Sequence, residues 1–149
     1  MNPHNLPSPS EFGHRADLQI RFSDVDVLGH VNNTVYMSFY DTGKALFFTD
    51  ILERKVDWKS VDTVIANIDC CFVAPIFFGE KIEVLTRCEA MHEKSFEVMQ
   101  MIVEKETRAV KSACRTVMVC FDHFTQSSKE MPEMWRTALE KSMGGRKQA

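Results

Sequence analysis

Apolar and polar positions alternate near the start of the chain and then recur at helical spacing. Residues 17–23 place Leu18, Ile20 and Phe22 on one face and polar side chains on the other, which predicts a half-buried strand. From residue 33 to about 50, apolar or small residues recur at steps of three and four, as on the buried side of a helix. Asn32 or Asn33 would be the N-cap of this helix.

Gly43 lies inside the predicted helix, where glycine costs roughly 1 kcal/mol relative to alanine. The close approach of another backbone would compensate for this loss. We therefore expect the helix to be packed tightly against a sheet.

The second half of the chain has the pattern of strands followed by a short helix. After a turn region around residues 57–60, strands are predicted at 64–74, 82–90, 95–105 and 109–121. The last two carry apolar residues on both faces, which indicates a central position or a face covered by another subunit. Residues 132–143 have helical spacing, and Gly144-Gly145 would end that helix. The order of elements predicts an α+β fold with an antiparallel sheet around one major helix.

The length and composition fit one globular domain. The chain has 149 residues, of which 44% are hydrophobic, and its net charge of −3 gives no sign of a nucleic-acid partner. No apolar run approaches the roughly 20 residues of a membrane span, and the five cysteines are typical of reduced thiols in a cytoplasmic protein. We expect a flexible tail over residues 1–16, a single domain over 17–143 and a second flexible tail over 144–149.

The segment between the first predicted strand and the long helix carries the candidate chemistry. Asp24, Asp26, His30, Asn32 and Asn33 all lie there. The start of a helix has unpaired N–H groups and positive potential, so it can hold a carboxylate and polarise a carbonyl together. The pattern therefore indicates chemistry on an acyl group.

Several spaced residues give this segment a family resemblance. They are Phe22, Asp24, Asp26, Gly29, Asn32, Asn33 and Tyr36, followed by Phe72-Val-Ala-Pro75, Gly79-Glu80 and Lys94-Ser95-Phe96. Over residues 17 to about 143 the chain resembles the hotdog-fold thioesterases of the 4-hydroxybenzoyl-CoA thioesterase type. Its His30-Val-Asn-Asn33 version is similar to the plant acyl-carrier-protein thioesterases and to many bacterial acyl-CoA thioesterases.

This resemblance implies a long helix wrapped by an antiparallel sheet. It also implies a homodimer, in which two sheets join edge to edge and two active sites form at the subunit boundary; many members pair again into homotetramers. The substrate would be a thioester of CoA or of an acyl carrier protein, hydrolysed without a cofactor. The sequence has no HExxH motif and no cluster of Cys and His, so no metal is expected.

The resemblance also implies roles for single residues. Asp26 falls on the family's catalytic carboxylate, which acts as nucleophile or as the base that activates water. The main-chain N–H near Asn33 falls on the position that binds the thioester oxygen. His30 belongs to the active-site set in relatives that carry it, where it orients the carboxylate or the water. Two plainer interpretations stay open: Asp26 caps a turn, and His30 is bonded to backbone in that turn.

Other residues in the motif have less defined roles. Asp24 would point away from Asp26 on an extended backbone, and we expect it to be structural. Tyr36 is either a packing residue or part of the acyl pocket. Lys94 matches a family position that is often basic and near the nucleotide, and with Ser95 it is assigned to substrate binding; alternatively, it is a solvated lysine at a strand end.

The sequence thus predicts an acyl-CoA thioesterase. Leu28 stands where the plant enzymes have an asparagine, which favours the bacterial acyl-CoA type. A non-catalytic acyl-thioester binder would keep the pocket without needing Asp26. An acyl-carrier-protein thioesterase and a hydratase of the same fold are further alternatives, and the hydratases use a differently placed histidine–carboxylate pair.

Overall fold

The structure is a computed structural model that describes residues 1–53 and 63–144. Its elements, in chain order, are η1 (Pro9–Glu11), β1 (His14–Leu18), η2 (Phe22–Asp24), α1 (Asn33–Ile51), β2 (Thr63–Phe72), β3 (Ile82–Met91), β4 (Ser95–Glu104), β5 (Val110–Asp122), β6 (Ser127–Ser128) and α2 (Glu133–Met143). The turn predicted around residues 57–60 and most of the predicted C-terminal tail lie outside the described residues.

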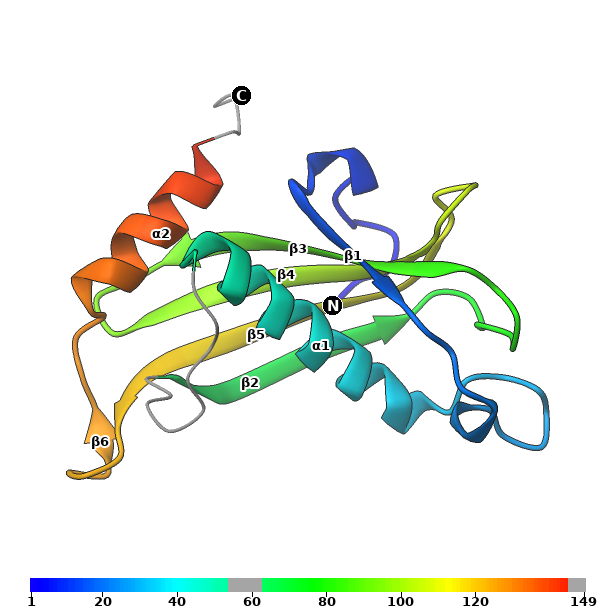
Figure 1. Cartoon of the computed structure of the whole chain (residues 1–149), viewed down its shortest axis with the longest axis horizontal. Coiled ribbons are helices and arrows are strands. Elements are labelled where there is room, and N and C mark those ends of the chain that lie inside the picture. The colour runs from blue at the N-terminus through cyan, green and yellow to red at the C-terminus, as the bar shows by residue number, and fades with distance from the viewer. Residues whose placement is uncertain (54–62, 145–149) are drawn as a thin grey trace.

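The strands form one curled antiparallel sheet, and α1 lies across one of its faces (Figure 1). The strand order is β1-β3-β4-β5-β2, with β6 paired to β5. α2 lies beside the C-terminal end of α1, where the Trp135 ring is 5.0 Å from the Phe48 ring. This arrangement confirms the predicted α+β fold with a sheet around one long helix. β4 occupies the middle of the sheet, which explains why it carries apolar residues on both of its faces.

α1 is held by its N-cap and by close packing under its middle. The Asn32 side chain accepts the Thr34 N–H at 3.0 Å, so Asn32 is the N-cap. A Cβ added to Gly43 would lie 2.7 Å from both Gln100 Nε2 and a methyl group of Val84. The sequence interpretation expected a neighbouring backbone at Gly43, and this detail was wrong, because the groups that press on the helix are side chains of β3 and β4.

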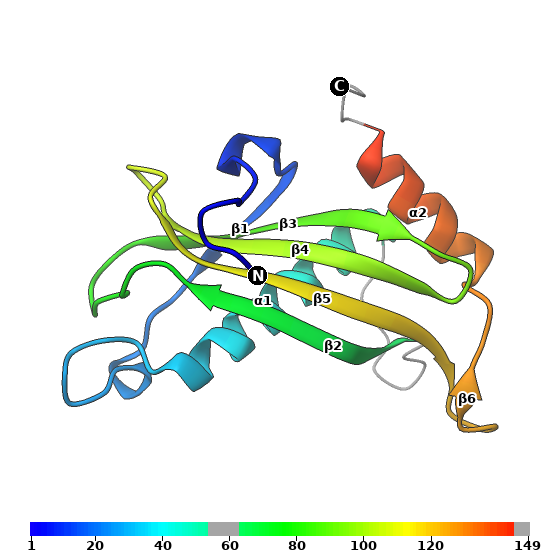
Figure 2. The same ribbon diagram turned by 180° about the vertical axis from the view of Figure 1, so that it is seen from behind.

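The N-terminal segment differs from the predicted tail. Figure 2 shows it on the sheet face opposite α1. Phe12 is only 5% exposed, lies 4.8 Å from the Arg87 guanidinium and packs in a cluster with Leu85, Met99 and other residues of β3, β4 and β5. β1 begins at His14 and ends at Leu18, so the alternation up to residue 23 overstated the strand; Phe22 lies in η2 and is 81% exposed. The proline-rich composition gave no sign that one aromatic side chain would anchor the segment.

Asp24 anchors the loop between β1 and α1. It is 1% exposed, and its carboxylate accepts the backbone N–H of Arg21 at 2.7 Å and the Arg21 guanidinium at 2.9 Å. The side-chain hydrogen bond from Arg21 holds the pKa of Asp24 below its usual value, against the opposing effect of burial. The Asp24 carbonyl also accepts the Asn32 N–H at 2.8 Å. Asp24 therefore has the structural role expected of it and ties the loop to the start of α1.

Gly43→Ala is expected to destabilise the fold. Alanine gains roughly 1 kcal/mol in helix propensity, but overpacking costs about 1–3 kcal/mol, so we expect a net loss on the order of 1 kcal/mol. Gln100 cannot move aside freely, because its Nε2 donates to the Tyr40 carbonyl and to Thr86 Oγ1. Urea unfolding would measure the change. Gly13→Ala, with no atom within 4 Å of the new Cβ, is the control; a Gly43→Ala variant more stable than wild type would contradict the packing argument.

Asp24→Asn is expected to lower the free energy of unfolding by about 1–3 kcal/mol at neutral pH, since a buried charge-assisted hydrogen bond is lost. The pKa of Asp24 is lowered by folding, so its contribution is present above the unfolded value of about 3.9 and disappears as pH falls through the folded value. The difference in free energy of unfolding between the variant and wild type should therefore be smaller in acid than at neutral pH. An equal difference in acid and at neutral pH would refute the structural role of the Asp24 carboxylate. Asp17→Asn, which removes an exposed partner of Lys105, should cost less than about 1 kcal/mol.

Candidate active site

Asp26 opens a tight turn that closes at His30. The Asp26 N–H donates to the His30 carbonyl at 2.8 Å, and the Gly29 N–H donates to the Asp26 carbonyl at 3.0 Å. One carboxylate oxygen of Asp26, Oδ1, accepts the N–H of Leu28 at 2.9 Å and the N–H of His30 at 3.3 Å. Gly29 has a φ of +79°, which favours glycine there. The backbone of the turn thus fixes the carboxylate through one oxygen, and Oδ2 has no hydrogen-bond partner within residues 1–53 and 63–144.

The Asp26 turn lies at the surface of the single chain. In the single chain Asp26 is exposed, as are Val27 and Leu28 beside it. The physical reason is that this turn projects from the edge of the fold, and it is Asp24 that enters the interior. A second surface would have to cover Asp26 before its carboxylate could act away from bulk water.

The backbone of His30 bonds to Asp26, whereas the His30 ring packs against a different residue. The imidazole stands edge-to-face against Phe77, with 4.9 Å between ring centroids, and the two residues also form an isolated β-bridge. In the described part of the chain, the ring makes no hydrogen bond to the Asp26 carboxylate. The expected role of the ring in orienting the carboxylate therefore remains a prediction.

The N-terminus of α1 begins directly after this turn. Asn33 is exposed and is the first helical residue, and its N–H has no acceptor among the described residues. Such a group carries the positive end of the helix dipole and can bind a carbonyl oxygen. The Asp26 carboxylate and the Asn33 N–H thus belong to one short segment, with the carboxylate at the start of the turn and the N–H at the start of the helix that follows it.

Tyr36 packs beneath the first turn of α1. It is buried, and its ring stands edge-to-face on Phe72 of β2 at 5.0 Å. Burial raises the pKa of the Tyr36 hydroxyl, so it stays protonated at neutral pH. These contacts favour the packing interpretation of Tyr36 over direct contact with substrate.

Lys94 and Ser95 lie at the other end of the molecule from Asp26. Lys94 lies between β3 and β4, and Ser95 is the first residue of β4. This end of the hairpin contacts α2 and the residues just before it: Arg136 of α2 donates to the carbonyl of His92, and the Met131 N–H donates to the Glu93 carbonyl. Figure 1 shows this hairpin beside α2, whereas the Asp26 turn precedes the opposite end of α1. A helix of 19 residues is about 28 Å long, so one chain does not bring Lys94 to Asp26.

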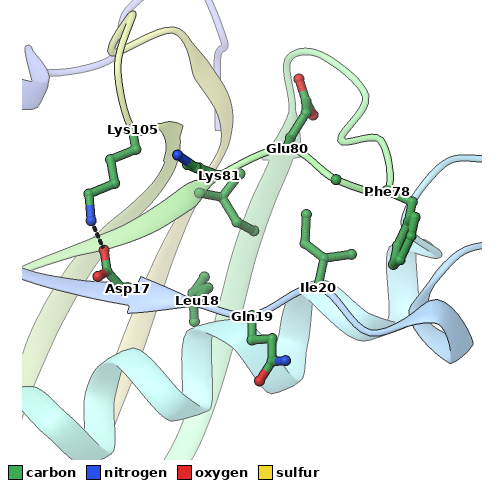
Figure 3. Close-up of a pocket in the computed structure, with 10 residues that line it drawn as sticks. Asp17, Leu18, Gln19, Ile20, Phe78, Glu80, Lys81 and Lys105 are labelled. Carbon is green, nitrogen blue, oxygen red and sulfur yellow. Dashed lines mark hydrogen bonds and ion pairs between the residues drawn. The ribbon is translucent and has the colours of Figure 1, made fainter.

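A groove of about 380 Å³ adjoins the loop on its β1 side (Figure 3). It is lined by Asp17, Leu18, Gln19, Ile20, Phe78, Gly79, Glu80, Lys81, Ile82 and Lys105. Its cationic and anionic side chains are balanced, and Lys105 is paired with Asp17 at 2.6 Å. Phe78 connects the groove to the loop through an edge-to-face contact with Phe22. The sequence interpretation did not identify this groove, because its walls are far apart along the chain.

Two apolar surfaces near the site were also missed. One is formed by exposed side chains around the turn: Phe22, Val27, Leu28, Phe77 and Phe78. The other is on β2, where Ile68 and Phe72 remain 42% and 52% exposed although they are on the same strand face as Cys70, which packs against the α1 core. Exposed apolar groups of this kind mark contact surfaces. The alternating pattern of β2 predicted that one of its faces is apolar. It did not predict that α1 leaves part of this face exposed.

Other features bear on the class of site. Within residues 1–53 and 63–144, no three or more His, Cys, Asp or Glu side chains are grouped as metal ligands would be. In the same part of the chain, no helix has the length and apolar character needed to cross a membrane.

Solved structures with the same fold include thioesterases and a hypothetical protein in complex with CoA. A thioesterase from Thermus thermophilus, complexed with coenzyme A and Zn, has a TM-score of 0.79 and 23% identity, covering 91% of this chain and 98% of that one. A 1,4-dihydroxy-2-naphthoyl-CoA thioesterase from Synechocystis has a TM-score of 0.76 and 17% identity, over 84% and 93%. A hypothetical protein from Staphylococcus aureus in complex with CoA has a TM-score of 0.80 and 11% identity, over 91% and 86%. At these identities the likeness shows the hotdog fold.

The sequence itself gives the family. No curated protein matches it. The family model described as the Thioesterase-like superfamily matches residues 20–139, which span the Asp26 turn, α1 and the sheet from β2 to β5. This match covers most of the chain and agrees with the fold, so the protein belongs to the thioesterase-like superfamily.

Proposed function

We propose that the protein hydrolyses an acyl-CoA thioester to a carboxylic acid and CoA. The observation that supports this most directly is that one short segment carries both the Asp26 carboxylate, bonded through Oδ1 alone, and the Asn33 N–H, and that neither Oδ2 nor this N–H has a partner among the described residues. Thioester hydrolysis needs a nucleophile or base beside a donor for the developing oxyanion, and these two groups supply both. CoA is favoured as the carrier because two of the structural neighbours above are complexes with it.

Each group has a defined task in this mechanism. The Asn33 N–H, helped by the dipole of α1, would bind the thioester oxygen and stabilise its negative charge as the tetrahedral intermediate forms. Oδ1 of Asp26 is occupied by backbone N–H groups, which leaves Oδ2 for the reaction. Oδ2 would attack the thioester carbon or take a proton from the attacking water, and the sulfur of CoA would leave as the thiolate.

A second copy of the chain would complete the site. β2 is an edge strand of the described sheet, so its outer backbone groups can pair with another strand. If β2 pairs antiparallel with β2 of a second copy, the twofold axis places the α2 end of one chain beside the Asp26 end of the other. Lys94 and Ser95 of the partner would then approach Asp26, and the partner would shield the carboxylate from water. A homodimer is the smallest assembly that does this, and a homotetramer would be a pair of such dimers.

The acyl group has an apolar surface available in this arrangement. Ile68 and Phe72 on β2 would line the space between α1 and the partner, with Tyr36 behind Phe72. The cysteines are free thiols, which fits the reducing conditions of the cytoplasm as the place of the reaction.

One alternative has an observation in its favour. The Asp26 carboxylate caps its own turn through the N–H groups of Leu28 and His30, and a residue with only that role would suit a non-catalytic acyl-thioester binder. Binding and hydrolysis assays on the wild type separate the two functions, because a binder would hold the thioester without cleaving it and would keep its affinity when Asp26 loses its charge.

Asp26→Asn is expected to lower kcat for acyl-CoA hydrolysis by about 10²–10⁴-fold, since it removes the charge and keeps the size of the side chain. A panel of short, long, branched and aromatic acyl-CoAs, followed by release of the free thiol, would measure the loss. Asp50→Asn is the matched control: Asp50 is exposed at the opposite end of α1 and pairs with His14, so its loss should leave kcat unchanged. Near-normal hydrolysis by Asp26→Asn would show that Asp26 is not the catalytic carboxylate, whereas wild-type protein that binds acyl-CoA without cleaving it would favour the binder.

His30→Ala is expected to change the acid limb of the pH profile of kcat/KM, because in this proposal the ring orients the Asp26 carboxylate or the attacking water. Steady-state rates between about pH 5 and 9 would define that limb. His4→Ala, an exposed histidine in the N-terminal segment, should keep the wild-type profile. An acid limb unchanged in His30→Ala would mean that the ring serves only to pack against Phe77.

Mixed dimers test whether two chains share the site. Asp26→Ala and Lys94→Glu should each impair hydrolysis, and when coexpressed they should recover about a quarter of the wild-type activity, because half of randomly paired dimers hold one intact site of two. Coexpression of two differently tagged Asp26→Ala chains is the control and should recover none. Failure of the first pair to recover activity, with dimers confirmed by sedimentation, would show that Lys94 is outside the site.

A further inference from the structure

Two cysteines face each other across adjacent strands beneath α1. Cys70 of β2 is the register partner of Cys114 of β5. Cys114 belongs to the core cluster that includes Tyr36 and Tyr40, and Cys70 packs against the same cluster. Both sulfurs are therefore on the α1 side of the sheet, and the hydrolysis mechanism uses neither of them.

The hydrogen-bond pattern of the ladder brings this pair close together. The Val73 N–H donates to the Lys111 carbonyl at 2.9 Å, which fixes the phase of the β2–β5 ladder. Bonded and non-bonded pairs alternate in an antiparallel ladder, so Cys70–Cys114, three positions along, is a non-bonded pair. Such pairs have Cα atoms about 4.5 Å apart, within the roughly 4.4–6.8 Å that a disulfide requires. The two strands thus place the backbones of Cys70 and Cys114 at a separation that a disulfide can span.

The surroundings give the two thiols different properties. The neighbouring Cys114 side chain and the hydroxyls of Ser112 and Tyr40 lower the pKa of Cys70 to about 7, whereas Cys70 and burial raise the pKa of Cys114. The Ser112 hydroxyl, which also bonds the Tyr40 hydroxyl, lies 3.7 Å from the Cys70 sulfur. Cys70 is half-buried between the exposed Ile68 and Phe72, whereas Cys114 is buried. Small solutes can reach Cys70 first.

We propose that Cys70 and Cys114 form a thiol–disulfide exchange site whose substrate is a low-molecular-weight disulfide. The Cys70 thiolate attacks one sulfur of the disulfide, forming a mixed disulfide and releasing one thiolate. Cys114 then loses its proton and attacks the Cys70 sulfur, which forms the Cys70–Cys114 bond and releases the second thiolate. Two protein thiols are oxidised, one disulfide is reduced to two thiols, and the two protons go to the released sulfurs. In a reducing cytoplasm such a bond is transient, as expected of a redox-sensing pair.

Cys71 provides an internal comparison. It is the next residue on β2 and is also half-buried, but it belongs to the cluster on the opposite face of the sheet, and its register partner is Ala113. Burial raises the pKa of the Cys71 thiol. Cys71 therefore has neither the facing sulfur nor the thiolate character of Cys70.

Glutathione disulfide is the probe for this site, and no hydrolysis assay is needed. The full chain, fully reduced, would be incubated with graded ratios of glutathione disulfide to glutathione, quenched in acid and analysed by intact mass and peptide mapping. We expect wild type to lose two hydrogen atoms, with the bond mapping to Cys70 and Cys114, and to regain them on return to glutathione alone. A persistent glutathione adduct on wild type, a bond that maps elsewhere, or no reaction would each overturn the proposal.

Three variants assign the order of the steps. Cys114→Ala should stop at the mixed disulfide, with one glutathionyl group on Cys70, and Cys70→Ala should leave Cys114 unmodified. Cys71→Ala should behave as wild type. Circular dichroism before the reaction would show that each variant is folded, and Cys114→Ser replaces Cys114→Ala if the smaller side chain unfolds the protein. Modification of Cys114 in folded Cys70→Ala would contradict Cys70 as the attacking thiol.

Discussion

The fit of α1 into the sheet is the constraint on which the rest of the structure depends. At Gly43 the helix comes so near to Val84 and Gln100 that no side chain has room between them. This contact fixes how deeply α1 sits, and Asn32 fixes where it starts. The N–H of Asn33 is therefore held at a defined height above the end of the sheet, beside the Asp26 turn. The packing of α1 against the sheet thus determines where the Asn33 N–H, a hydrogen-bond donor, is positioned.

The anchoring of the loop is a second, more local condition. Asp24 and Asp26 are two residues apart and chemically identical, yet one is buried against Arg21 and the other is exposed. The first gives the loop its conformation and the second remains available for chemistry. This division explains how a carboxylate can be held by two backbone N–H groups and still keep an oxygen for a substrate.

Features that are local in sequence were predictable, and those that depend on distant partners were not. The spacing in α1 and the alternation in β3 gave these elements to within a residue or two, and the segment from Asp24 to Asn33 gave the candidate groups, because each pattern repeats within a few residues. The role of Phe12 escaped prediction, since its partners lie on β3, β4 and β5, far along the chain. The distance between Lys94 and Asp26 within one chain was not predictable either, because a motif match does not say how far apart two residues lie in the fold.

The N-terminal segment has a consequence for biosynthesis. Phe12 and His14 are synthesised before the strands that they contact: His14 pairs with Thr86, and the face on which Phe12 packs is complete only once β5 has been made. Non-local contacts of this kind form late, because a long loop must close before they stabilise anything. Until then the nascent chain carries an uncovered phenylalanine, and the partly built sheet displays Met99 and Met101 to the solvent. Phe12 can therefore reach its buried position only after about a hundred further residues have been synthesised, up to Ala113 of β5.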